Sequence, residues 1–125
     1  MDRPNIIKEK SYQFAIEIVH LYKKMKKQNE FILSRQIVRS GTSIGANVEE
    51  ALAAQSRKDF ISKMSIASKE ARETNYWLRL LRDTNVVEDL DLKQILKDSQ
   101  AIVKIITSIV KTSKNNDENY SDRNP

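Results

Sequence analysis

The sequence has 125 residues, a net charge of +5, two glycines, two prolines, no cysteine and a single histidine, His20. This length allows one ordinary domain, and so few turn-forming residues argue against a β-sandwich or a doubly wound α/β fold. Without cysteine and with one histidine, we expect no disulfide, no metal and no cofactor. No apolar run approaches the ~20 residues of a membrane span and the N-terminus lacks a signal peptide's apolar core, so we expect a soluble cytoplasmic protein.

The first periodic segment predicts a helix that begins near Pro4, a residue tolerated in the first turn of a helix. Its inward positions recur every three or four residues: Ile7, Ser11, Phe14, Ile18, Leu21 and Met25. It ends in the cluster KKMKK, Lys23 to Lys27. Cations favour the C-terminal end of a helix dipole, and we prefer this interpretation to an RNA contact.

The second segment contains both glycines, in the stretch RSGTSIGANVEEA from Arg39 to Ala51. Gly41 and Gly45 are in phase with the apolar positions Ile37, Ile44 and Val48, which predicts a helix. A helical glycine costs about 1 kcal/mol relative to alanine, so we expect a neighbouring helix to pack closely there. The alternative, a phosphate-binding loop, lacks both the GxxxxGK[ST] and the GxGxxG spacing.

The third segment has a capping-box-like start, with Ser56 as the N-cap and Asp59 three residues later. Its a/d pattern runs from Phe60 to Leu81, and we expect the helix to end within residues 82–85. A fourth run extends from Leu92 to Val110 and is followed by a polar tail. We therefore predict an all-α, antiparallel up-down four-helix bundle over residues 1–113 and a disordered tail over residues 114–125.

Charge is distributed unevenly between these segments. The third segment, residues 56–83, contains seven Lys or Arg against four Asp or Glu, whereas residues 84–113 contain four of each. A basic surface favours anionic partners such as nucleic acid, although surplus lysine also serves solubility alone. The predicted nucleic-acid contacts are Arg57, Lys58, Lys63, Lys69, Arg72, Arg79 and Arg82.

Two helices have more apolar surface than a monomeric bundle uses. The apolar residues of the fourth helix span about 180°, against a typical stripe nearer 100°. On the third helix, three apolar residues lie nearly opposite the core line. We predict an oligomer interface that includes Ile66, Trp77, Leu80, Ile105 and Ile109. The alternative is that Trp77 lies flat over a neighbouring loop of its own chain.

Glu70 and Glu73 flank this second apolar patch, so their carboxylates need partners from another helix or another subunit. Arg35 and Arg39 are the candidates. Paired carboxylates can also perform acid–base catalysis, but no histidine is near them in the sequence and the Glu-x-x-His motif of di-iron bundles is absent. We therefore expect no enzymatic activity and no small-molecule substrate.

The segment from Ser34 to Leu81 resembles the family of four-helix bundle proteins encoded by intervening sequences in bacterial 23S ribosomal RNA genes. The similar motifs are the S-I-x-x-N-[IV]-x-E block at Ser43–Glu50, the start of the next helix at Arg57–Phe60, and the E-x-x-E-x-x-[YW] region at Glu70–Trp77. Many members carry proline where this chain has Gly45, and Glu-Gly where it has Glu50-Ala51.

The resemblance implies an up-down four-helix bundle. It also implies a homopentamer, because relatives such as the accessory variability proteins of diversity-generating retroelements assemble as barrel-shaped pentamers, and those relatives are basic and bind nucleic acid. The sequence thus favours a non-enzymatic, oligomeric bundle that binds RNA or DNA. The alternative is a protein-interaction or scaffolding module without nucleic-acid binding.

Overall fold

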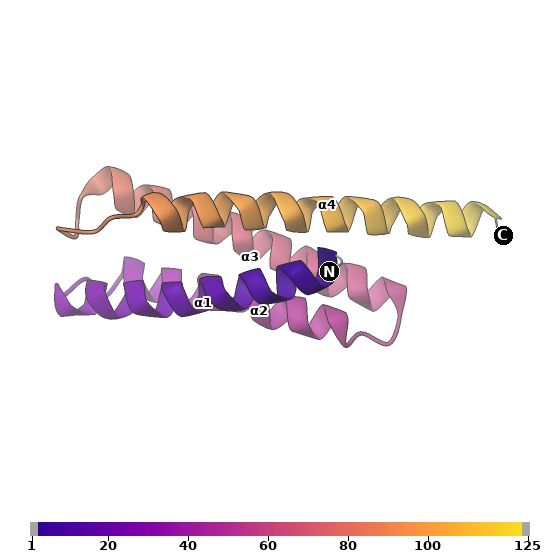
Figure 1. Cartoon of the computed structure of the whole chain (residues 1–125), viewed down its shortest axis with the longest axis horizontal. Coiled ribbons are helices and arrows are strands. Elements are labelled where there is room, and N and C mark those ends of the chain that lie inside the picture. Colours follow the sequence, from indigo (N-terminus) through magenta and orange to yellow (C-terminus); the bar gives the residue numbers. More distant parts are fainter. Residues whose placement is uncertain (1–2, 124–125) are drawn as a thin grey trace.

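The structure is a computed structural model that describes residues 3–123, with the side chains of residues 5–118. The helices are α1 (Arg3–Lys27), α2 (Leu33–Leu52), α3 (Arg57–Thr84) and α4 (Lys93–Arg123). Each helix packs against the next, and α4 also returns to α1, where the contact is weakest. The predicted all-α antiparallel four-helix bundle is confirmed (Figure 1).

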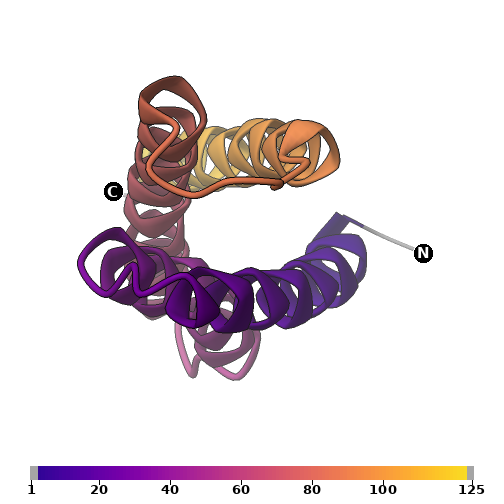
Figure 2. The ribbon, with the colours of Figure 1, turned by 90° about the vertical axis from the view of Figure 1, so that its left-hand side faces the viewer.

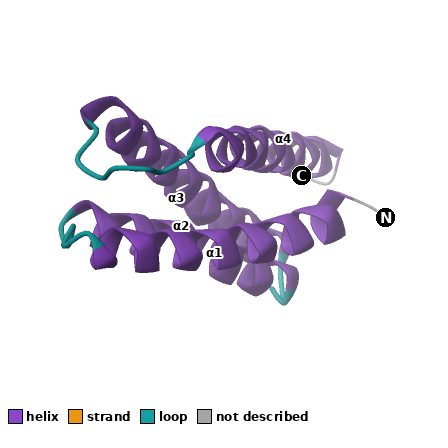
Figure 3. Ribbon diagram, turned by 60° about the vertical axis from the view of Figure 1, so that its left-hand side comes forward, coloured by secondary structure: helices purple, strands orange, loops and turns teal. Residues whose placement is uncertain are grey.

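The α1–α2 and α3–α4 connections lie at one end of the bundle and the α2–α3 connection lies at the other (Figure 3). The side chain of Gln28 joins the α1–α2 connection to the α3–α4 connection. Its Nε2 donates to the Glu88 carbonyl at 2.7 Å, and its Oε1 accepts from the Glu88 N–H at 2.9 Å. This pair of hydrogen bonds fixes the α3–α4 connection over the end of α1.

Side chains near the helix ends satisfy backbone groups that have no partner within a helix. Before α2, the Glu30 carboxylate accepts hydrogen bonds from the N–H groups of Ile32, Leu33 and Ser34 at 2.8–3.1 Å. The predicted N-cap of α3 is confirmed, because Ser56 Oγ accepts from the Asp59 N–H at 3.0 Å. The C-cap of α3 is Asn85, which adopts the left-handed conformation with φ 52°.

The core is formed by the predicted stripes of all four helices. Buried members include Phe14 of α1, Ile44 of α2, Leu78 of α3 and Ile106 of α4. Viewed along the bundle, the helices follow one another around this core in chain order (Figure 2). No helix in the described part of the chain is long and apolar enough to cross a membrane.

The two glycines lie within α2 and are buried, as predicted. A Cβ on Gly41 would lie 2.8 Å from both Cγ1 and Cγ2 of Ile18 in α1. A Cβ on Gly45 would meet the Ser11 carbonyl and hydroxyl oxygens at 3.4 Å, an ordinary contact. The glycines therefore allow α1 and α2 to approach closely, and Gly41 is the position at which added volume cannot be accommodated without movement.

Residues 114–123, for which the sequence predicts a disordered tail, continue α4 as helix to Arg123. Helix continuation requires only local hydrogen bonds, and residues 93–123 contain no glycine or proline to interrupt it. This end of α4 projects beyond the other three helices (Figure 1). The predicted boundary at residues 113/114 therefore coincides with no break in the helix, and the division into domain and tail remains a prediction. Residues 124–125 lie outside the described part.

Candidate nucleic-acid interface

The seven cations predicted to contact nucleic acid do not share one face of α3. Lys58, Lys69, Arg72 and Arg79 are exposed and are separated by three, seven or eleven residues, a spacing that places them along one side of a helix. Lys63 faces α2 instead, because its Nζ lies 3.5 Å from Glu50 Oε2. The structure therefore brings together four of the seven on the outer side of α3.

The remaining two cations lie near the ends of α3. Arg57 is exposed in its first turn. Arg82 lies in its last turn and forms hydrogen bonds to the carboxylate of the adjacent Asp83, at 2.7 Å from Nε and 3.2 Å from Nη2. These bonds lower the pKa of Asp83 below its ordinary value and raise that of Arg82. Part of the charge of Arg82 is therefore neutralised by its neighbour.

Arg72 and Arg79 border the seam between α3 and α4, where polar side chains hold both in place. Arg72 Nη2 donates to Thr107 Oγ1 at 3.0 Å, and Arg79 Nε donates to Asn75 Oδ1 at 3.0 Å. Asn75 in turn donates to the buried Ser99 of α4 at 3.3 Å. Because only some of their N–H groups are engaged, both guanidinium groups retain donors for a phosphate.

An aromatic side chain lies among these cations. Tyr76 is 49% exposed, and the guanidinium of Arg79 lies over its ring at 5.9 Å from the centroid. Trp77 packs against the same ring in an edge-to-face arrangement, with the ring centroids 5.1 Å apart and the planes at 71°. Arg79 and Trp77 thus hold an exposed ring in a defined position, as a stacking platform for a base requires.

α4 contributes a second row of cations that the sequence analysis did not identify. Lys93, Lys97, Lys104 and Lys111 are exposed and are separated by four or seven residues, so they lie on one side of the helix. Within residues 5–118, none of the four forms an ion pair. The net charge of zero for residues 84–113 concealed this row, since three of the four acids precede α4. The lysine spacing itself could have revealed it.

These two rows lie on neighbouring helices and are joined at the Arg72–Thr107 hydrogen bond. We call their combined surface the α3–α4 basic face. It consists of Lys58, Lys69, Arg72, Arg79, Lys93, Lys97, Lys104 and Lys111.

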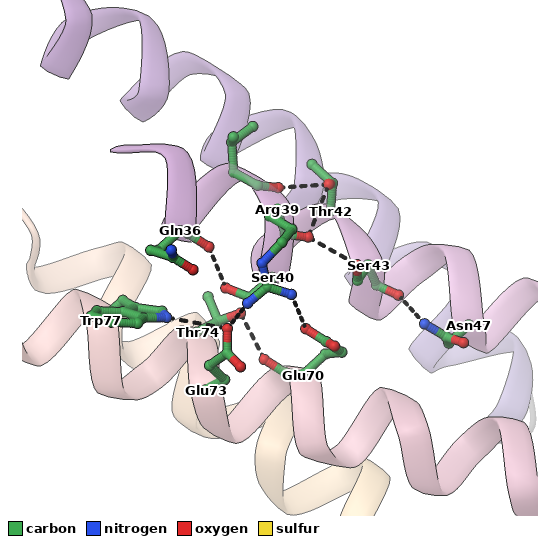
Figure 4. Close-up of polar contacts among 11 residues, drawn as sticks. Gln36, Arg39, Ser40, Thr42, Ser43, Asn47, Glu70, Glu73, Thr74 and Trp77 are labelled. Atoms are coloured by element: carbon green, nitrogen blue, oxygen red, sulfur yellow. Dashed lines mark hydrogen bonds and ion pairs between the residues drawn. The ribbon is translucent and has the colours of Figure 1, made fainter. Parts of the chain in front are cut away.

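Two of the four carboxylates of α3, Glu70 and Glu73, are directed toward α2. Arg39 of α2 forms ion pairs with Glu70, at 3.4 Å, and with Glu73, and the latter also accepts from Trp77 Nε1 at 3.2 Å (Figure 4). The prediction that Arg39 partners these carboxylates is confirmed. Arg35, the other candidate, has no ion pair among the described residues. Glu70 and Glu73 thus pair with α2, whereas Asp83 pairs with Arg82, and Lys58, Lys69, Arg72 and Arg79 remain exposed on the outer side of α3.

The seam between α1 and α4 has the opposite charge. A groove of about 500 Å³ lies there, lined by apolar residues of both helices together with three acids, Glu9, Glu17 and Asp98, and one cation, Lys10. Burial raises the pKa of Glu17, and the charge of Asp98 and a hydrogen bond to it raise it further. This acidic groove repels phosphate, so it strengthens the separation of charge across the molecule.

The five residues of the predicted oligomer interface are partly used within the chain. Ile109 is buried in the core, and Ile105 and Trp77 pack against it. Ile66 is 39% exposed, and Leu80 is half-buried. The wide apolar arc of α4 is largely explained by its two neighbours, since α4 packs on α3 and on α1.

Large apolar side chains outside these five are exposed as well. Tyr12 and Ile16 on α1 are 58% and 38% exposed, and Ile32, just before α2, is 77% exposed. Within the described residues, no group of three or more His, Cys, Asp or Glu side chains could hold a metal ion.

The fold and the candidate interface define a basic antiparallel four-helix bundle whose charges are separated by face. Residues 3–108 match the family described as 23S rRNA-intervening sequence protein, and the chain belongs to this family. It is also similar to a crystal structure of a protein of unknown function from the S23 ribosomal protein family of Bacteroides thetaiotaomicron. The two chains are 51% identical with a TM-score of 0.82, over 88% of this chain and 99% of the other. No curated protein matches the chain.

Proposed function

We propose that this protein is a non-enzymatic, cytoplasmic helical bundle that binds RNA or DNA through the α3–α4 basic face. The observation that supports this most is the separation of charge by helix side. Eight cations lie on adjacent outer faces, while Glu70 and Glu73 of α3 are paired with Arg39 of α2 and the acids at the α1–α4 seam line a different groove.

The dimensions of the face suit a nucleic-acid backbone. From Lys93 to Lys111 the α4 row extends about 27 Å at the helical rise of about 1.5 Å per residue. This equals about eight phosphate spacings of about 3.4 Å along one strand. Affinity on such a face comes mainly from counterion release, so binding should weaken steeply with salt. The exposed ring of Tyr76 adds a stacking contact for an unpaired base.

The experiment compares two variants that each remove four positive charges. One replaces Lys93, Lys97, Lys104 and Lys111 with Gln, and its matched control replaces Lys23, Lys24, Lys26 and Lys27 at the end of α1 with Gln. Affinity for a structured RNA is measured from low to physiological salt. We expect the α4 variant to lower the slope of log K against log salt by up to about four, roughly one per lost contact.

The control should change this slope little, because its lysines lie off the basic face. Equal losses in both variants would mean that net charge alone attracts the RNA. A larger loss in the α1 variant would move the interface to the cluster of lysines at the end of α1.

A protein-interaction role is the second candidate, and the exposed apolar side chains of α1 favour it. Tyr12, Ile16 and Val19 line a shallow hollow of about 300 Å³ on the outer side of this helix. We propose that a second copy of the chain covers this surface in a homo-oligomer, for which the family resemblance implies a pentamer. The alternative is that these apolar residues stay exposed in a monomer, as single apolar residues often do.

Light scattering at micromolar concentration tests this assembly. A mass of two or more chains of 14.5 kDa supports the assembly, and a mass of five chains supports the pentamer. Replacing Ile16 with Lys should then lower the mass without changing helix content, whereas Ile66→Lys tests the interface that the sequence predicted. A wild-type mass of a single chain would exclude the oligomer.

A further inference from the structure

A second groove lies at the corner where α3 ends and α4 begins. Its volume is about 490 Å³, within the range of about 300–1,000 Å³ for sites that hold small ligands. It is lined by the last turn of α3, by the connection over residues 85–92 and by the first two turns of α4. We call it the corner groove. It lies at the Lys93–Lys97 end of the α3–α4 basic face.

The interior of the corner groove is apolar. Leu81, Val87, Leu92 and Leu96 line it, and each is less than one tenth exposed. The connection is held in place by the two hydrogen bonds between Gln28 and Glu88, so this lining is formed before any ligand arrives. A flat, weakly polar group would bury its faces against such a lining.

The rim of the corner groove is cationic and carries two side-chain amides. Lys93, Lys97 and Arg82 lie on it, although Arg82 shares its charge with Asp83. Asp91 is the acid that lines the groove, and its Oδ1 accepts from the Lys93 N–H at 3.1 Å. The amides are those of Asn85 and Gln100, and neither forms a hydrogen bond within the described residues.

From this combination we propose that the corner groove binds an unpaired nucleotide, at a bulge or a strand end, as the specific element of a nucleic acid held on the basic face. The base enters the apolar interior, where amides can bind the hydrogen-bonding groups on its edge. The lysines hold the flanking phosphates. This inference rests on the proposed function, since the bulk of the polynucleotide lies on the rest of the face.

Other occupants fit the groove less well. An isolated phosphate would use the lysines and leave the apolar interior empty. An uncharged apolar ligand would leave the lysines and both amides unused. A nucleotide uses all three kinds of lining, because it joins a flat base with hydrogen-bonding edges to a phosphate.

The first measurement uses amide NMR shifts with adenosine 5′-monophosphate as the probe and inorganic phosphate as its control. We expect the nucleotide to shift the amides of residues 81–100 that line the corner groove, and phosphate at the same concentration to leave the apolar lining unshifted. Equal shifts from phosphate would overturn the proposal in favour of a simple anion site. Shifts centred on Lys104 and Lys111 would overturn it as well.

The second measurement compares an RNA duplex that carries one bulged nucleotide with the same duplex lacking the bulge. Wild-type protein should prefer the bulged duplex by roughly tenfold, a ratio that corresponds to about one or two net hydrogen bonds. The double variant Asn85→Gly, Gln100→Ala should lose this preference. Glycine at position 85 retains the left-handed backbone, so the end of α3 remains intact.

A matched pair of lysines keeps the test valid if the double variant does not fold. Lys97 lines the corner groove, and Lys104 lies one heptad further along the same side of α4. Both Lys97→Gln and Lys104→Gln should lower the salt slope by about one. Only Lys97→Gln should reduce the preference for the bulge, and equal reductions in both would overturn the proposal.

The outcomes for this inference and for the proposed function can be distinguished. Equal binding of both duplexes by wild-type protein would overturn the corner groove as a nucleotide site while the basic face stands. If neither duplex binds at low salt, the proposed function fails, and shifts by adenosine 5′-monophosphate confined to the groove would still support a nucleotide site there.

Discussion

The α1–α2 seam and the α3–α4 seam are closed by opposite kinds of residue. Between α1 and α2, glycines allow backbone and side chain to touch, as Gly41 does against Ile18. Between α3 and α4, polar side chains reach across, as Arg72 does to Thr107. The first seam tolerates little added volume and is a determinant of stability, whereas the second leaves charged groups at the surface that can exchange partners.

The largest expected effect tests the tight seam. Gly41→Leu should lower the free energy of unfolding by about 1–3 kcal/mol or more, because even the Cβ lies too close to Ile18. Gly45→Ala is the matched control and should be mild or slightly stabilising, since its Cβ makes ordinary contacts and alanine favours helix. Urea denaturation measures both. A greater loss for Gly45→Ala than for Gly41→Leu would contradict this account of the seam.

The next largest effect is expected when the charges of two arginines at the α3–α4 seam are reversed. Reversing Arg72 and Arg79 to Glu should lower the salt slope of RNA binding by about two or more, because two phosphate contacts are lost and repulsion replaces them. The free energy of unfolding should change far less than in Gly41→Leu, since both side chains are exposed. Unchanged RNA affinity at low salt would remove this face from consideration.

A smaller and more local effect concerns the ring beside Arg79. Tyr76→Ala should weaken binding to single-stranded RNA by about 1–3 kcal/mol, the usual contribution of one stacked base. Tyr76→Phe retains the ring and should bind as wild type, which separates stacking from the hydroxyl group. Fluorescence anisotropy at fixed salt measures both variants. If the two lost affinity equally, the ring would not be a stacking platform.

The smallest effect extends the comparison to the α1–α4 seam. Because the pKa of Glu17 is raised above its ordinary value of 4.5, its ionisation disfavours the folded state. The protonated carboxyl group therefore contributes to the stability of the folded state. This contribution is fully present below pH 4.5 and is lost as the pH rises through the raised pKa.

Glu17→Gln should therefore be more stable than wild type above pH 4.5, and the difference should vanish below it. We expect only a few tenths of a kcal/mol, roughly, because the side chain is largely solvated. Thermal unfolding across pH measures it, with Glu9→Gln in the same groove as the control. A stabilisation of equal size in both variants would point to net charge and not to the contact with Asp98.

Much of the fold could be predicted because its signals are local. The three- and four-residue spacing of apolar residues identified all four helices, and Ser56 with Asp59 marked the start of α3. The end of α4 could not be predicted in this way. Polarity predicted disorder from residue 114, yet the absence of glycine and proline allows the helix to continue to Arg123.

Less of the candidate site could be predicted. The surplus of cations in α3 predicted that this helix contacts nucleic acid. Four of the seven predicted contact residues share its outer side, whereas Lys63 is paired with Glu50. The lysine row of α4 was missed because net charge averages over all sides of a helix. The need of Glu70 and Glu73 for partners could be predicted because both carboxylates flank a predicted apolar patch, but only the structure selects Arg39 from the two candidates, Arg35 and Arg39.

The sequence by itself determined the helices, their inward sides, the N-cap of α3 and the family, since each depends on residues within a few turns of one another. Only the tertiary structure decided which helices are neighbours and therefore which charges meet. The same helix rotation and register that place Gly41 against Ile18 also direct Glu70 toward α2 and leave Arg72 beside α4. The corner groove exists for this reason too, because its lining comes from α3, the connection and α4 together and no single segment contains it.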